Sequence, residues 1–201
     1  MWRQRLPYYA YNDIHQLIDT VRAATTRQQS REMDLIVKPE ARLLFRVLNF
    51  FNSRHILQVG VSTGIESVTM LQVNSQNRLY LYDPQLEQNP LAVRILQTQL
   101  DRIECYNDIR VAIDEFMEAR KADESPLLAL INDPVDNDLL ARLLDAQCVL
   151  VMRNLHRNEA MKAQFDDACR YMPMGQTYTN EKIAILNPNP KLQREDFLLW
   201  L

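Results

Sequence analysis

From residue 55 onward the chain alternates short apolar runs with longer amphipathic stretches, and this alternation limits the folds that it can adopt. The apolar runs are HILQV (55–59), RLYLY (78–82), RIECY (102–106), LLALI (127–131) and CVLVM (148–152). Such runs are typical of strands buried on both faces, and the stretches between them have the apolar spacing of helices. Repeated strand–helix units form parallel sheets with helices on both sides. The pattern therefore predicts a three-layer α/β sandwich around a mostly parallel sheet.

The flanking segments predict further helices before the sheet and an antiparallel end after it. Periodic apolar residues indicate a helix over 12–24, a polar connection over 25–32, a second helix after Pro39, and another over 158–172. Asn89 before Pro90 predicts an N-cap. The runs QTYT (176–179), KIAILN (182–187) and FLLWL (197–201) are close together, which favours antiparallel pairing and about seven strands in all. We expect one domain over 1–201, with N-terminal helices in 1–52 and the sheet core in 55–201.

Composition indicates an ordinary globular protein of the cytosol. The net charge of −3 gives no sign of a basic surface for nucleic acid. The three cysteines form no CxxC pair, so neither a zinc site nor a disulfide framework is indicated, and Cys105 and Cys148 are expected to be buried thiols. No apolar stretch follows the N-terminal arginines and none approaches membrane-spanning length, so we expect neither a signal peptide nor a membrane segment.

Candidate ligand-binding residues follow the strands, because open α/β sheets bind ligands beyond the carboxyl ends of their strands. Two of the three glycines, Gly60 and Gly64, lie in the five-residue turn after the first strand. This turn either cradles a nucleotide or is only a tight strand–helix connection. Asp83 either accepts the hydroxyls of a ribose or starts a turn before proline. Asp108 either binds an adenine amino group or caps the next helix.

HILQVGVSTGIESVTML resembles the first motif of S-adenosylmethionine-dependent methyltransferases of the small-molecule O-methyltransferase kind, close to acid-x-G-x-x-T-G-x-x-S. Three further segments are similar to other parts of the family: KPEARLLFRVLNFFNSRH before this motif, and CVLVMRNLHRNEAM and KLQREDFLLWL after it. The resemblance therefore covers about 35–201. It implies a Rossmann-like methyltransferase fold and S-adenosylmethionine as cofactor. The cofactor residues that it implies are Gln58, Gly60, Ser62, Thr63, Gly64, Asp83, Asp108 and Asn132.

Several acids of the family pattern are replaced. Gln58 stands where the family has an acid for the methionine ammonium group, and its amide carries no charge. Asn132 follows the fourth strand, where the family usually has Asp. Arg153 and Asn154 follow the fifth strand, where cation-dependent relatives have two acids that bind metal. Because arginine repels a cation, no metal is predicted here. Arg153 and Asn154 are instead expected either to bind an anionic acceptor or, for Arg153, to pair internally with Asp133 or Asp136.

His156 matches a histidine of the family, and it is either a general base or a loop histidine that bonds backbone. His15 and His55 are expected to be structural. Three functions remain open. The first is a metal-independent methyltransferase that acts on a small-molecule acceptor. Such a protein can be a monomer or a homodimer. The second is a noncatalytic binding protein or partner subunit on the same fold, which Gln58, Asn132 and Arg153 favour. A nicotinamide-dependent reductase is weaker, because G-x-G-x-x-G lacks its third glycine and Ser62 replaces the second.

Overall fold

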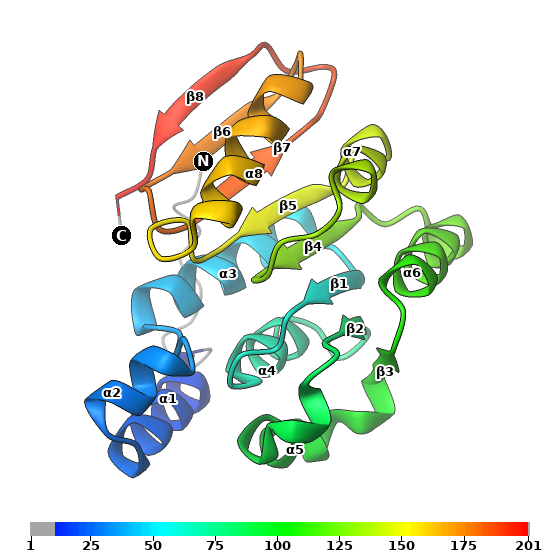
Figure 1. Cartoon of the computed structure of the whole chain (residues 1–201). Helices are drawn as coiled ribbons and strands as arrows, with labels where there is room; N and C mark the ends of the chain where they lie inside the picture. Colours follow the sequence, from blue (N-terminus) through cyan, green and yellow to red (C-terminus); the bar gives the residue numbers. More distant parts are fainter. Residues whose placement is uncertain (1–10, 201) are drawn as a thin grey trace.

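A computed structural model describes residues 11–200 and shows a single eight-stranded sheet with helices on both faces (Figure 1). The strands are β1 (His55–Val59), β2 (Arg78–Tyr82), β3 (Ile103–Tyr106), β4 (Leu128–Ile131), β5 (Val149–Met152), β6 (Gln176–Thr179), β7 (Ala184–Asn187) and β8 (Glu195–Leu198). The helices are α1 (Asn12–Ala24), α2 (Arg27–Glu32), α3 (Lys38–Phe51), α4 (Ile65–Gln72), α5 (Pro90–Leu96), α6 (Ile109–Asp123), α7 (Asn137–Asp145) and α8 (Glu159–Tyr171). Short 3₁₀ turns occupy Leu86–Gln88 and Gln97–Arg102. Because 1–10 and 201 lie outside the described residues, the division into 1–52 and 55–201 stays a prediction.

The strand order is β3-β2-β1-β4-β5-β7-β6-β8, with β1 in the interior of the sheet. Strands β1 to β5 run parallel, and Gln58 on β1 is opposite Leu81 of β2 and Leu130 of β4. Strand β7 is antiparallel to both β5 and β6, whereas β8 is parallel to β6. The predicted parallel core and antiparallel end are confirmed. The sheet has eight strands rather than about seven, and β8 at its edge overlaps the run predicted at 197–201.

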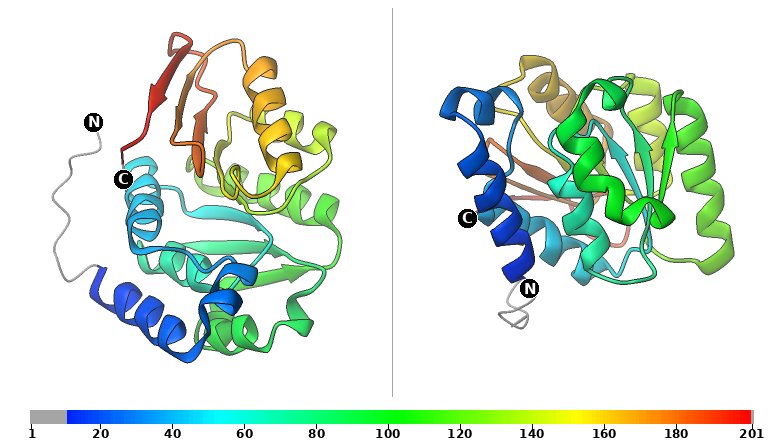
Figure 2. Two further views of the ribbon diagram at one scale, coloured as in Figure 1. Left: turned by 60° about the vertical axis from the view of Figure 1, so that its left-hand side comes forward. Right: turned by 90° about the horizontal axis from the view of Figure 1, so that it is seen from below.

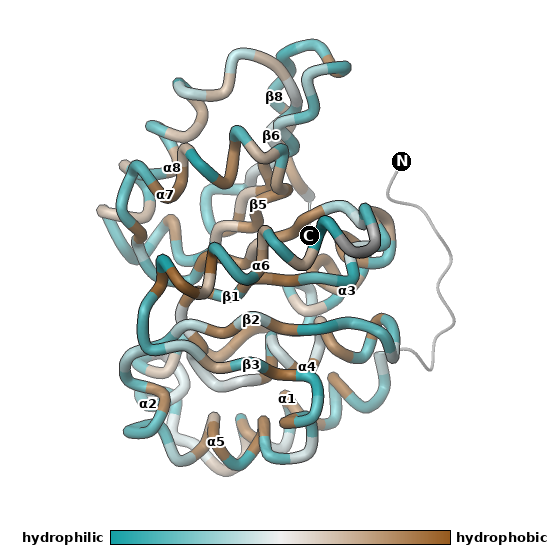
Figure 3. Tube along the Cα trace, turned by 90° about the vertical axis from the view of Figure 1, so that its right-hand side faces the viewer, coloured by the Kyte–Doolittle hydropathy of each residue, from teal (hydrophilic) through white to brown (hydrophobic). Residues whose placement is uncertain are grey.

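Successive residues of each strand point to opposite faces, so the sheet separates two cores (Figure 2). Ile56 and Leu130 pack against α1, α3, α4 and α5, while Leu57 and Ile131 pack against α6, α7 and α8. Strands coloured as hydrophobic therefore lie inside more hydrophilic helices and loops (Figure 3). The predicted three-layer sandwich is confirmed, and the apolar runs are continuous because both of their faces are covered.

Helix α2 corrects one expectation, since residues 25–32 were predicted to be only a connection. The backbone N–H of Gln29 donates to the Thr26 hydroxyl at 3.1 Å, and the Gln29 side chain accepts from the Thr26 backbone at 2.9 Å. This reciprocal pair is a capping box, which satisfies free donors at a helix start. The predicted cap before α5 is confirmed, because the Asn89 side chain accepts from the backbone N–H of Ala92.

The expectation that Cys105 is buried is wrong. Cys105 is exposed, because it lies on β3, the edge strand at one end of the sheet, where only Ile103 is buried. Cys148 is buried as predicted. None of the described helices is both long enough and apolar enough to span a membrane.

Candidate functional site

A cavity of about 930 Å³ opens at the carboxyl ends of β1, β2, β4 and β5. Its walls are formed by residues 32–34, 59–60, 62, 82–85, 88–91, 132–134 and 154. This volume is in the range of sites for small molecules, and this edge of the sheet is where open α/β folds bind ligands. Predicted site residues that line it are Gly60, Ser62, Asp83, Asn132 and Asn154.

Gly60 forms the floor of the cavity with a φ of 78°, a conformation that favours glycine. Its carbonyl oxygen accepts hydrogen bonds from the side chains of Gln58, at 3.0 Å, and Asn132, at 2.8 Å. The Gln58 amide oxygen in turn accepts from Ser67 at 2.7 Å, so both ends of this buried amide are hydrogen-bonded within the protein. A Cβ on Gly60 would collide with the carboxylate of Asp133, so the close approach of these two loops also requires glycine.

Ser62 joins the glycine turn to the segment before α3. Its hydroxyl lies 2.7 Å from the carbonyl oxygen of Met33 and 3.0 Å from that of Asp34. Gly64 also has a positive φ, of 80°, but a Cβ there would contact Leu96 of α5 at 3.3 Å and Gly64 does not line the cavity. Substitution of Gly64 therefore acts first on the packing of α5, not on the cavity.

Asp83 borders the cavity at the end of β2. One carboxylate oxygen accepts the backbone N–H of Val61 at 2.9 Å, and the other accepts that of Gln85 at 2.8 Å. Each oxygen keeps one further acceptor position, because a carboxylate offers about four in all. Asp83 thus fixes the glycine turn and keeps acceptor positions at the cavity wall.

The other predicted site residues also lie outside the cavity walls: Gln58, Thr63, Asp108, Arg153 and His156. Thr63 is buried beneath the turn. Asp108 caps α6 by accepting the backbone N–H of Arg110 at 2.7 Å, and a helix cap was one of the two roles predicted for it. His156 is exposed, and its ring nitrogen accepts from Arg157 at 3.1 Å. Partial burial and the Arg157 charge lower the pKa of His156. Its role as a base stays a prediction.

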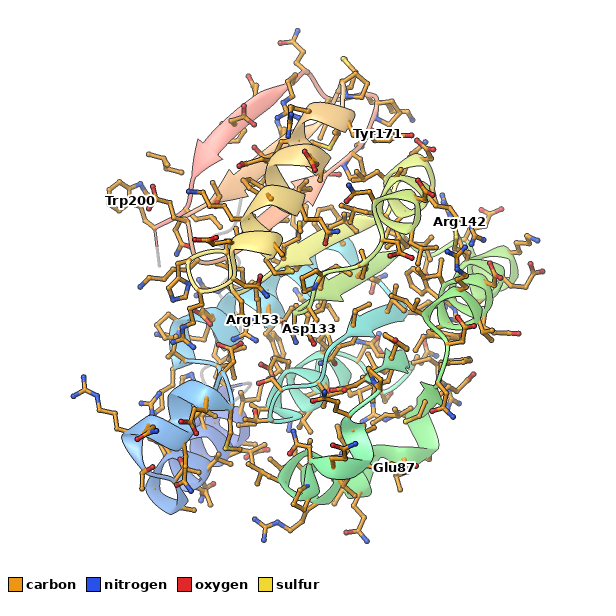
Figure 4. All side chains as sticks on the ribbon, in the orientation of Figure 1. Glu87, Asp133, Arg142, Arg153, Tyr171 and Trp200 are labelled. Atoms are coloured by element: carbon orange, nitrogen blue, oxygen red, sulfur yellow. The ribbon has the colours of Figure 1, made fainter. Side chains whose placement is uncertain are left out.

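Arg153 is the centre of a buried ion cluster beside the cavity (Figure 4). Its Nη1 lies 2.6 Å from the Glu66 carboxylate and 3.3 Å from that of Asp34, and its Nη2 lies 3.3 Å from that of Glu40. Asn132 also accepts from Nη1, at 3.3 Å. The cluster thus connects α3, α4, β5 and the segment before α3.

The internal partners predicted for Arg153 are wrong. Asp133 lies at the cavity, and Asp136 lies 3.5 Å from Arg110. The buried carboxylates come instead from segments far away in sequence. Because Arg153 does not line the cavity and is surrounded by acids, its predicted binding of an anion receives no support from this geometry. Asn154 does line the cavity and donates to the Asn132 carbonyl at 3.4 Å.

Electrostatics within the site are dominated by carboxylates. Burial raises the pKa of Glu66 to about 7, although the Arg153 charge opposes this shift. Burial, and then the charges of Asp83 and Asp34, raise the pKa of Asp133. The charged residues in the described cavity wall are Glu32, Asp34, Asp83 and Asp133, without a lysine, arginine or histidine.

Sequence reasoning missed the wall formed by Glu32, Met33 and Asp34. Glu32 ended an expected polar connection and the two residues after it were given no structure, so no motif associated this segment with the strand ends. The signal that could have found it is the capping box at Thr26, which indicates an ordered helix leading to a fixed loop. Across the part of the chain described, no group of three or more His, Cys, Asp or Glu residues is arranged to hold a metal ion.

Solved structures share this arrangement of strands and helices. A methyltransferase from Geobacter sulfurreducens has a TM-score of 0.57 and 15% identity, over 91% of this chain and 93% of the other. An O-methyltransferase from Streptomyces achromogenes in complex with SAM has a TM-score of 0.53 and 12% identity, over 90% of this chain and 97% of the other. An O-methyltransferase from Bacillus cereus with SAH has a TM-score of 0.54 and 10% identity, over 92% and 93%.

The fold is that of the O-methyltransferases. The expected Rossmann-like methyltransferase fold is therefore confirmed, at 10–15% sequence identity to these structures. No protein-family model matches the chain. No curated protein matches it in sequence either.

Proposed function

We propose that this protein is a metal-independent methyltransferase that uses S-adenosylmethionine to methylate a small molecule. The observation that carries the proposal is the cavity at the ends of β1, β2 and β4, lined by Gly60 and Asp83. It occurs in a fold shared with O-methyltransferases that were crystallised with SAM and SAH. The bound cofactor would supply an activated methyl group.

The residues present fit a nucleoside cofactor. Asp83 keeps a free acceptor position on each oxygen, which suits the two hydroxyls of a ribose. Gly60 keeps the floor of the cavity free of a side chain, and the hydrogen bonds from Gln58 and Asn132 hold its carbonyl in place. Ser62 and Asn132 would border the methionine part. The volume of about 930 Å³ leaves room for an acceptor beside the cofactor.

A noncatalytic binding protein is the second candidate, and the position of His156 favours it. His156 is the predicted general base, yet it is exposed and outside the cavity wall. Methyl transfer to an ionised or nucleophilic acceptor needs no protein base. The position of His156 therefore restricts the acceptors to such groups and still allows methyl transfer.

Calorimetric titration with S-adenosylmethionine and S-adenosylhomocysteine tests the proposal. We expect micromolar or tighter dissociation constants for both, in the presence of a chelator. The absence of heat and of a thermal shift at millimolar cofactor would reject the proposal. Binding without methyl transfer to any member of an acceptor panel supports the noncatalytic alternative. A small-molecule acceptor, a homodimer and a cytosolic location stay predictions.

A further inference from the structure

The charge of the cavity wall is one-sided. Its charged residues are four carboxylates, and three of them already have ion-pair or hydrogen-bond partners within the protein. Asp34 lies 2.8 Å from Arg157 and 3.3 Å from Arg153, so it faces two guanidinium groups. Asp83 accepts two backbone N–H groups. Glu32 accepts an amide N–H from Gln28 at 2.7 Å.

Asp133 differs from these three. Among the described residues it has no ion-pair or hydrogen-bond partner for its carboxylate. The side chain is exposed at the cavity wall and lies against Gly60. Figure 4 places it in the middle of the molecule, close to Arg153 in that view but without an ion pair to it. Its pKa is raised by burial and by repulsion from Asp83 and Asp34. A carboxylate in this position is stabilised by any cation that enters the cavity.

We propose that Asp133 is the residue by which the cavity selects a positively charged group on its ligand. Gln58, the polar side chain nearest to this place along β1, is excluded from the task, because its amide is buried and bonded to Gly60 and Ser67. The inference rests on the proposed function for the identity of this group, which is the ammonium of the amino-acid part of S-adenosylmethionine.

The test compares two ligands that share the adenosine and the thioether, of which only one carries the ammonium and carboxylate of an amino acid. S-adenosylhomocysteine carries the ammonium group, and 5′-methylthioadenosine lacks the amino-acid part. The variant is Asp133→Asn, which keeps the size of the side chain over Gly60 and removes its charge. Asp138→Asn is the matched control, because Asp138 is exposed on α7 and does not line the cavity.

We expect Asp133→Asn to weaken S-adenosylhomocysteine binding about ten- to a hundredfold, the usual effect of losing a charged hydrogen bond. Methylthioadenosine should bind the wild type and Asp133→Asn equally, and Asp138→Asn should change neither ligand. Equal losses for both ligands, or no loss for either, would overturn the inference while leaving the proposed function intact.

If the wild type binds neither nucleoside, the proposed function fails and a simple cation decides the inference. Agmatine should then raise the melting temperature of the wild type and of Asp138→Asn more than that of Asp133→Asn. No shift in any of them, or equal shifts in all three, overturns the selection of positive charge by Asp133.

Discussion

The guanidinium of Arg153 lies 2.6 Å from the carboxylate of Glu66, and both side chains are almost completely inaccessible to solvent. The two residues are 87 positions apart, on α4 and just after β5. Such a pair is costly to remove from water, and removal of either side chain leaves the other buried without its partner. It therefore makes the carboxyl edge of the sheet sensitive to single substitutions.

Arg153→Met should lower the free energy of unfolding by about 3–5 kcal/mol, because it leaves Glu66 buried without its cation. Urea denaturation measures the change. The double variant Arg153→Met/Glu66→Gln should recover part of this loss, since the amide needs no countercharge. A single variant within about 1 kcal/mol of the wild type would show that the ion pair is not structural.

The pH dependence of stability should report Glu66. Its pKa in the folded protein is about 7, above the ordinary 4.5, so the folded state holds a proton that the unfolded state has released. A raised acid pKa means that stability is lost as pH rises from about 5 to about 7. Glu66→Gln cannot titrate, so its stability relative to the wild type should increase over that interval and level off above it. A difference that stays constant from pH 5 to pH 8 contradicts this assignment.

Gly60→Ala should destabilise the protein by about 1–3 kcal/mol. The new Cβ meets the Asp133 carboxylate, and alanine is strained at a φ of 78°. In an Asp133→Ala background the collision disappears and only the backbone cost, about 1 kcal/mol, should remain. Thermal or urea unfolding of the four proteins separates the two contributions. Additive effects of the two substitutions would mean that the loops move apart freely.

Asp83→Ala should weaken S-adenosylmethionine binding by about 1–3 kcal/mol, through loss of its acceptor positions. It also frees the backbone N–H groups of Val61 and Gln85, so calorimetry needs a parallel melting curve. Asp138→Ala is the control for a change of charge alone. Unchanged affinity in a folded Asp83→Ala protein would remove Asp83 from the ligand site.

The parallel core could be predicted from sequence because each strand is a continuous apolar run. Burial on both faces leaves no polar alternation, as in LLALI and CVLVM, and the structure covers both faces of these strands. The turn at Gly60 could also be predicted as a candidate site, because few glycines occur in this chain and ligands bind at the strand ends.

The partners of Arg153 could not be predicted in the same way. Its carboxylates come from the loop at Asp34, from α3 and from α4, and only the packing of these elements against the strand ends brings them together. Acids that follow the neighbouring fourth strand, such as Asp136, were the sequence-based expectation. The predicted burial of Cys105 was wrong for a related reason, because an apolar run does not show whether its strand lies at the edge of the sheet.

The position of β7 between β5 and β6 affects the chain while it is being synthesised. Strand β6 leaves the ribosome before β7, yet its hydrogen-bond neighbours are β7 and β8, which follow it. Until residue 187 has emerged, the apolar edge of β5, with Leu150 and Val151, lacks the strand that pairs with it in the native sheet. An exposed apolar edge is a template for wrong pairing with other chains. Slow translation or a stop codon just before Ala184 should therefore favour aggregation more than a similar interruption after Asn187.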